Sequence, residues 1–245
     1  MSELESNRGR TRDAEKTREV ILNAAEAVFA EHGFGRARID AIAQVADYNK
    51  SLIGQYFGDK LGLYVEVLKR ADSELDALLA HGLAPLLADG TFSFHAHGFR
   101  TFLETLVQTM FDYLIEHPRF LRLLTWEMAE GWQTYAQIVS QLSSGNADQS
   151  ETLFAKAWSA GLLRSDFSPM IQLTLVYQIC QSYLAFLPLY QILLPGEDVS
   201  SARMLARGRD YIVALIVQGM MVDPKDGEAG EFRVNRPEAR NDDTK

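Results

Sequence analysis

Apolar residues recur at helical spacing along nearly all of this 245-residue chain. In residues 15–32, one such stripe comprises Ile21, Leu22, Ala25, Val28 and Phe29. No segment sustains the alternation of apolar and polar residues that marks a half-buried strand. Because 47% of the residues are hydrophobic, the chain can fill one large core or the cores of two domains. We therefore expect an all-α protein.

Three segments near the N-terminus predict a helix-turn-helix. Gly33 ends the first helix, as glycine commonly does at a helix C-terminus, and residues 39–43 mark a short second helix. Asn49 caps a third helix that ends near Phe57, and Asp59 caps the long helix that follows. In this arrangement the third helix projects from a small core into the major groove, where its side chains reach base edges.

The remainder of the chain predicts further helices separated by short breaks. Pro118 and Pro169 each stand at a first helical position, where the missing N–H costs nothing, and Ser168 caps the second of these helices. The helices expected after the first three cover residues 60–81, 95–116, 119–130, 133–142, 147–160, 168–194 and 200–221. Residues 88–94 are expected to form a loop, residues 143–146 a break, and residues 223–245 a disordered polar tail.

The charge is distributed unevenly. Residues 1–70 hold 11 Lys and Arg against 11 Asp and Glu, whereas the remainder holds 13 against 22, which accounts for the net charge of −9. Only the first segment can approach phosphates without strong repulsion. Its basic residues gather at the start, as Arg8, Arg10, Arg12, Lys16 and Arg18. We expect residues 1–12 to form a flexible basic arm, which is either a solvated tail or a DNA-contacting segment.

The stretch EAVFAEHGFGRARIDAIAQVADYNKSLIGQYFGDKLGLYVEVL resembles the N-terminal domain of TetR-family regulators. Three elements occur in order: F-A-E-H-G-F at the end of the first helix, I-A-x-x-A within the second, and Y-F-x-x-K after the third. The resemblance implies a DNA-binding domain over residues 13–70, followed by a helical ligand-binding and dimerisation domain over residues 71–222. It also implies a ligand-responsive transcriptional regulator, most often a repressor released by a small-molecule inducer.

The resemblance also assigns DNA contacts by position. The residues so assigned are Arg38, Tyr48, Asn49, Lys50, Ser51, Leu52, Gln55, Tyr56 and Lys60. Lys50 can donate to guanine or to a phosphate, and Leu52 can contact a thymine methyl. Tyr56 and Lys60 resemble the family's phosphate clamps, while Ile53 and Phe57 are expected to be buried.

The chain departs from the family pattern at three places. Ala37-Arg38 replaces the usual hydroxyl residue at the start of the second helix, and Asp47 replaces the usual turn glycine. Gly54 stands where a phosphate-contacting tyrosine is usual, and glycine inside a short helix costs up to about 1 kcal/mol relative to alanine. Gln55 can compensate at a phosphate or at adenine. DNA binding is therefore expected, but no operator sequence can be carried over from the family.

The C-terminal part predicts a homodimer and an effector site. Two helices that are apolar on nearly every face, in residues 171–194 and 204–221, need cover from a second copy, as in the four-helix bundles of family dimers. Dimerisation suits a palindromic double-stranded DNA operator. The effector is expected to be flat or apolar and to contact Phe102, Met110, Trp126, Met128 and Tyr177. These five residues also fit a plain core.

Other functions are less well supported by the sequence. Residues 167–196 are uncharged and long enough to span a bilayer, but four glutamines and Pro188 disfavour that. His95 and His97 point apart on a helix, so neither a metal nor another cofactor is expected. The sequence shows no nucleophile–base pair of the kind that would indicate an enzyme. A charged N-terminus and a single cysteine fit the cytoplasm. A helical small-molecule-binding protein with a decayed DNA-binding head remains the alternative.

Overall fold

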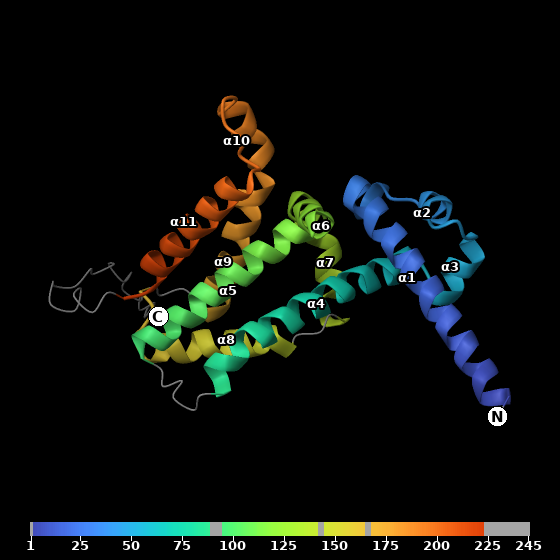
Figure 1. Ribbon diagram of the computed structural model, residues 1–245, viewed down its shortest axis with the longest axis horizontal. Coiled ribbons are helices and arrows are strands. Elements are labelled where there is room, and N and C mark those ends of the chain that lie inside the picture. Colours follow the sequence, from blue (N-terminus) through green and yellow to red (C-terminus); the bar gives the residue numbers. More distant parts are fainter. Residues whose placement is uncertain (1, 89–94, 142–144, 165–167, 223–245) are drawn as a thin grey trace, which may run out of the picture.

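The computed structural model describes residues 2–88, 95–141, 145–164 and 168–222, and this part of the chain folds into helices (Figure 1). The N-terminal head comprises α1 (Ser2–Arg36), α2 (Ile39–Ala46), α3 (Lys50–Phe57) and the first half of α4 (Lys60–Ala88). The C-terminal domain comprises α5 (Ala96–Glu116), α6 (Pro118–Ala129), α7 (Gln133–Ile138), the 3-10 turn η1 (Val139–Gln141), α8 (Gly145–Ser159), α9 (Pro169–Ala185), α10 (Leu187–Leu193) and α11 (Ala202–Met220). The all-α prediction is confirmed.

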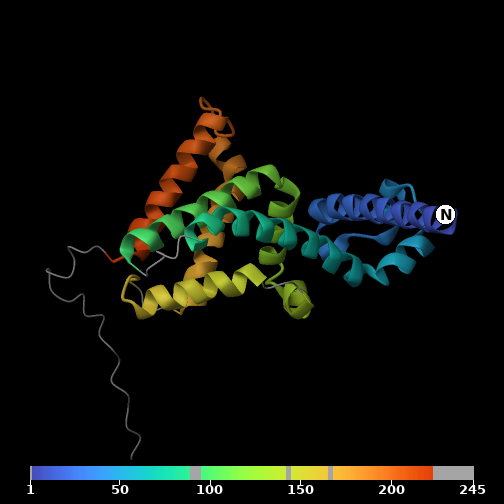
Figure 2. The ribbon, with the colours of Figure 1, turned by 60° about the horizontal axis from the view of Figure 1, so that its bottom comes forward.

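The head lies at one end of the molecule and α4 runs from it into the C-terminal domain (Figures 1 and 2). The core of the head forms around Phe29 and Tyr64, whose rings meet edge to face at 4.9 Å. Leu123 of α6 and Ile138 of α7 are buried in the same core. The head is therefore completed by helices that follow residue 70, the end that the sequence suggested for it.

The core of the C-terminal domain is built around α5. Phe99, Phe102, Leu106 and Met110 are buried there, as their helical spacing predicts. Phe154 of α8 packs edge-on against Phe99, with ring centroids 5.5 Å apart. Contacts from α4, α9 and α11 enclose the remaining faces of α5. The part of α4 that lies beyond the head therefore packs against this bundle.

Three helices differ from expectation. The prediction of a separate arm over residues 1–12 is wrong for residues 2–12, which continue α1 back to Ser2. This segment contains no proline and one glycine, so no residue in it forces the helix to stop. Residues 133–142 form α7 and then tighten into η1. The helix expected over residues 168–194 bends by 47° between α9 and α10, beside Pro188, which lacks the N–H that a continuous helix needs.

Of the expected loop at residues 88–94, only Ala88 is described, and it ends α4. Of the expected break at residues 143–146, residues 145 and 146 already belong to α8, and residues 143 and 144 lie outside the described residues, as does the tail at residues 223–245. Within the described ranges, no single helix is long and apolar enough to cross a membrane; α9 and α10 pass that test only when the bent pair is counted together.

Candidate nucleic-acid interface

The geometry of α3 matches the prediction from sequence. The helix spans Lys50–Phe57, and the side chain of Asn49 accepts a hydrogen bond of 2.8 Å from the Leu52 amide. Ile53 and Phe57 are buried in the head core. This anchoring leaves an outer face on which Lys50, Ser51 and Gln55 are exposed and Leu52 and Tyr56 are half-buried.

The turn between α2 and α3 is fixed locally. Asp47 adopts a left-handed backbone with a φ of 56°, a conformation that Asp tolerates better than most residues. The next amide, of Tyr48, donates to the carbonyl of Ala43 at 3.1 Å. The Tyr48 hydroxyl lies 3.4 Å from Thr17 Oγ1 of α1. The turn therefore holds α3 in a defined direction against α1.

Lys50 forms an ion pair with Asp40, which lies in the first turn of α2. Both side chains are more than half exposed, so the pair contributes at most about 1 kcal/mol. Arg38 occupies the N-cap position of α2, is exposed, and makes no capping hydrogen bond with its side chain. A basic group at each of these two helix starts suits phosphate contact, and Asp40 partly offsets the charge of Lys50.

Lys60 has a different environment from the one expected of a phosphate clamp. Its ammonium donates to the carbonyls of Phe34 at 2.9 Å and Ala37 at 3.2 Å, and lies 4.4 Å from the Phe34 ring centroid. A third contact, at 3.5 Å, goes to the Gly35 carbonyl. A lysine has three donors, so these carbonyls occupy all of them. In this structure Lys60 ties the start of α4 to the end of α1.

Gly54 lies in the exposed middle of α3. A Cβ atom built there would meet no heavy atom within 4 Å. Packing therefore does not demand a glycine at this position, and the backbone of α3 is open toward the side where DNA is expected.

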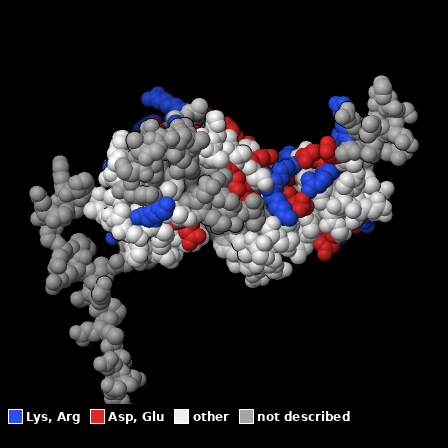
Figure 3. Space-filling view, turned by 90° about the horizontal axis from the view of Figure 1, so that it is seen from below, with Lys and Arg blue, Asp and Glu red and all other residues white. Residues whose placement is uncertain are grey.

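Basic and acidic side chains alternate where the head meets the C-terminal domain, and no single basic patch dominates this view of the surface (Figure 3). Arg18 pairs with Glu66, and Lys69 lies 3.1 Å from the same carboxylate. The electrostatic attraction of the described head for DNA therefore depends on the basic residues that are not paired within α1 and α4.

The α6 helix forms a polar joint with the head that the sequence did not reveal. The indole of Trp126 and the guanidinium of Arg122 both donate to the Ala30 carbonyl of α1, at 3.2 and 3.1 Å. Glu127 is 1% exposed and accepts from the Tyr64 hydroxyl at 2.7 Å and the Tyr135 amide at 2.9 Å. Burial, together with the Glu127 hydrogen bond, raises the pKa of Tyr64. The sequence signal of this joint is Glu127, a charged residue on the same helix face as the buried Leu123.

The five predicted effector contacts are not brought together. Phe102 and Met110 are buried in the C-terminal core, and Tyr177 packs against that core. The Trp126 indole donates to Ala30 of α1 at the joint with the head, and Met128 is exposed. Burial, and then the charges of Asp76 and Asp72, raise the pKa of Tyr177. Two carboxylates therefore act on a region expected to be apolar.

No cluster of three or more His, Cys, Asp or Glu suited to a metal ion occurs among the described residues. Of the two histidines considered for a metal, His95 instead caps α5, where its Nδ1 accepts from the Gly98 amide at 3.1 Å.

Two family models match the chain. Residues 21–67 match the model described as bacterial regulatory proteins, tetR family, and residues 100–216 match the tetracyclin repressor-like C-terminal domain. The chain is 38% identical over 119 residues to the HTH-type transcriptional repressor SCO4008 of Streptomyces coelicolor, covering 49% of this chain and 53% of that relative. It is 28% identical over 176 residues to the HTH-type transcriptional repressor NicS of Pseudomonas putida, covering 71% and 78%.

Solved structures share the fold. The Streptomyces coelicolor protein SCO4942 superposes with a TM-score of 0.58 at 24% identity, covering 83% of this chain and 98% of that one. A protein from Shewanella sp. PV-4 gives a TM-score of 0.62 at 14% identity, covering 84% and 99%. With the capped, outward-facing α3 and both family models in chain order, the chain belongs to the TetR family of helix-turn-helix transcriptional regulators.

Proposed function

We propose that this chain is a homodimeric, cytoplasmic repressor that leaves a palindromic operator when a small molecule binds its C-terminal domain. The observation that carries the proposal is the construction of α3. Asn49 caps it, Ile53 and Phe57 anchor it, and Lys50, Ser51 and Gln55 face outward from it. These outward groups have the chemistry that reads base edges and phosphates.

A decayed head is the less favoured alternative. The departures from the family pattern at Gly54 and Arg38 are the features that favour it, yet Gly54 leaves no gap in the core, and Arg38 is an exposed cation at the start of α2. Decay would instead be expected to erode the cap at Asn49 or the turn at Asp47, and both retain their geometry.

Dimerisation is supported by apolar surface on the last helices. Ile192 of α10 is 74% exposed and Tyr211 of α11 is 68% exposed, with Leu215 one turn further along α11. Exposed apolar patches of this kind mark interfaces. A second copy covering α11 would also supply the second α3 that two half-sites about 34–36 Å apart require.

The effector that we propose has an apolar or aromatic body and binds beside Phe102, Met110 and Tyr177 in the C-terminal domain. Its binding acts on the head through α4 and through the α6 joint, where Glu127 connects Tyr64 to Tyr135. By linkage, operator DNA weakens effector binding by the same factor as the effector weakens DNA binding.

The experiment is a salt titration of operator binding by variants of the Lys50–Asp40 pair. Lys50→Ala is expected to weaken binding and, for a phosphate contact, to lower the salt slope by about 1. Asp40→Asn is expected to strengthen binding, because it frees Lys50. Lys69→Ala removes the same charge from α4 and serves as the control. Unchanged affinity in Lys50→Ala, or equal losses in Lys50→Ala and Lys69→Ala, would contradict the role of Lys50.

A further inference from the structure

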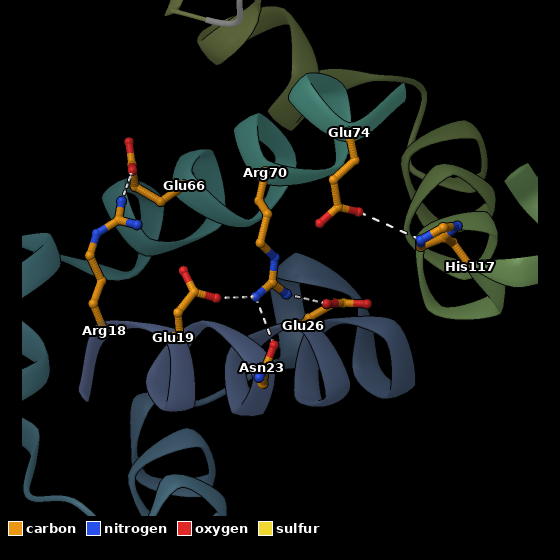
Figure 4. Close-up of polar contacts among 8 residues, drawn as sticks. All are labelled: Arg18, Glu19, Asn23, Glu26, Glu66, Arg70, Glu74 and His117. Carbon is orange, nitrogen blue, oxygen red and sulfur yellow. Dashed lines mark hydrogen bonds and ion pairs between the residues drawn. The ribbon is translucent and has the colours of Figure 1, made fainter. Parts of the chain in front are cut away.

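A single arginine holds α4 against α1 at the point where α4 leaves the head (Figure 4). Arg70 Nη1 lies 2.7 Å from Asn23 Oδ1 and 3.3 Å from Glu19 Oε2, and Nη2 bonds to Glu26 Oε2. The three partners occupy one face of α1, spread over two turns. The Arg70 side chain is only 19% exposed, so solvent screens these contacts less than it screens a surface ion pair.

Beside these contacts lies a groove of about 260 Å³ between α1, α4, α5 and α6. Glu19, Glu26 and Glu74 contribute carboxylates to its walls, and Arg70 contributes the only Lys or Arg side chain among the described residues that line it. Glu74 lies 3.5 Å from His117 Nε2 on the opposite wall. Without Arg70, the two carboxylates on α1 would face that of Glu74 with no guanidinium between them, and like charges would push α1 and α4 apart.

The helix that α4 packs against changes at Arg70. Glu66 and Arg70 contact α1, whereas the Ala71 carbonyl accepts a 2.9 Å hydrogen bond from the Tyr113 hydroxyl of α5. The part of α4 before this point therefore packs with the head, and the part after it packs with the C-terminal domain. A small change in the α1–α4 angle here is enlarged at α3, which lies at the far end of the head (Figure 2).

We propose that Arg70 is a positioning residue that fixes the angle between α1 and α4, and thereby the distance between the two α3 helices of the dimer. The inference rests on the homodimer of the proposed function. The inference goes beyond that function because one side chain, outside the proposed DNA and effector contacts, would set the spacing of the half-sites that the dimer binds. Arg18 pairs with Glu66 wholly within the head and does not line the groove, so it does not share this role.

The test measures the distance between the two heads directly. Ser51 is exposed on α3, and Ser51→Cys carries a spin label for pulsed dipolar electron paramagnetic resonance on the full-length dimer. Cys180 is fully buried, and burial raises the pKa of its thiol to about 12, so it stays unlabelled. Arg70→Met, which keeps the apolar stem, is expected to shift and broaden the distance distribution.

Two variants serve as comparisons. Lys69→Met removes the same charge one residue away and is expected to keep the parent distribution, because its contact is with Glu66 on its own helix. Arg70→Lys is expected to be intermediate, because a single ammonium cannot reproduce the bidentate fork that spans the α1 partners. A purely stabilising role would lower the unfolding temperature of Arg70→Met without moving the distribution of the folded dimer.

The outcomes separate the two proposals. A distribution in folded Arg70→Met equal to that of the parent overturns the inference and leaves the homodimer standing. Absence of any dipolar signal in the labelled parent overturns the homodimer and the inference with it. If Arg70→Met does not fold, Glu26→Gln tests the same contact from α1 and is expected to broaden the distribution; an unchanged distribution overturns the inference.

Discussion

At the scale of single residues, substitution of Gly54 is expected to have opposite effects on stability and on DNA binding. Its position is helical, exposed and free of neighbours within 4 Å, so Gly54→Ala is expected to raise the free energy of unfolding by about 0.4–1 kcal/mol. Operator affinity is expected to fall, because the added methyl lies on the face toward DNA. Urea unfolding and operator titration measure the two effects.

Gly58 provides the matched control for that substitution. It also has no neighbour within 4 Å of a built Cβ, but its φ is +75°, which strains any other residue. Gly58→Ala is therefore expected to lower stability by about 1 kcal/mol. Stability changes of the same sign in both variants would contradict the assignment of Gly54 as a surface glycine in an ordinary helical conformation.

Asp72 predicts a pH dependence of stability. Its Oδ2 is buried without a hydrogen-bond partner among the described residues, and burial, followed by the like charge of Asp76, raises its pKa from 3.8 to about 6. The folded state thus binds this proton more tightly than the unfolded state does. The contribution of Asp72 to stability is therefore most favourable below pH 3.8 and is lost as the pH rises through about 6.

Asp72→Asn is the corresponding variant. It is expected to be more stable than the parent at neutral pH, with a difference that narrows as the pH falls from 6 toward 3.8. Urea midpoints of both proteins across this interval measure the difference, and the shared effects of other carboxylates cancel. A constant difference at every pH would show that Asp72 does not titrate in this window.

At the scale of helices, the junction between α1 and α4 assigns Lys60 a structural role. Lys60→Met keeps the stem over Phe34 but removes the donors to three carbonyls, at an expected cost of about 1.5–3 kcal/mol in unfolding free energy. The salt slope of operator binding is expected to stay the same. Lys50→Met should behave in the opposite way, with a smaller slope and nearly unchanged stability.

A reduced salt slope in Lys60→Met, without loss of stability, would instead support the phosphate clamp that the sequence indicated. Asn49 and Asp59 were predictable because the side chain of each accepts from an amide three residues further on. Asp47 was predictable because Asp tolerates the left-handed backbone that this turn requires. The contacts of Lys60 and Trp126 join residues 23 to 96 positions apart. Local spacing carries no record of such partners, so the sequence did not predict these contacts.

At the scale of the whole molecule, the exposed apolar face of α11 predicts the dimer. Leu215→Glu is expected to shift the protein toward monomer in sedimentation velocity, because it places a charge in the covered interface. Gln137→Glu adds the same charge at an exposed position on α7 and should leave the dimer intact. A dimer that withstands Leu215→Glu would place the interface elsewhere.

The helical periodicity predicted the fold class and the buried face of α5, because both depend on spacing within one helix. It did not predict that Leu123 and Ile138 complete the core of the head. Those residues fit equally well against any apolar surface, and only the path of the chain decides which surface they cover. For the same reason, Phe102 and Met110 were correctly predicted to be buried, but sequence could not show whether an effector reaches them.

The most direct test of the central claim is selection of bound DNA from a random pool by the full chain. The predicted result is enrichment of an inverted repeat whose half-site centres lie about 34–36 Å apart, with weaker enrichment in Lys50→Ala. No enriched motif, or the same motif at equal strength in Lys50→Ala, would contradict the assignment of α3 as the helix that reads DNA.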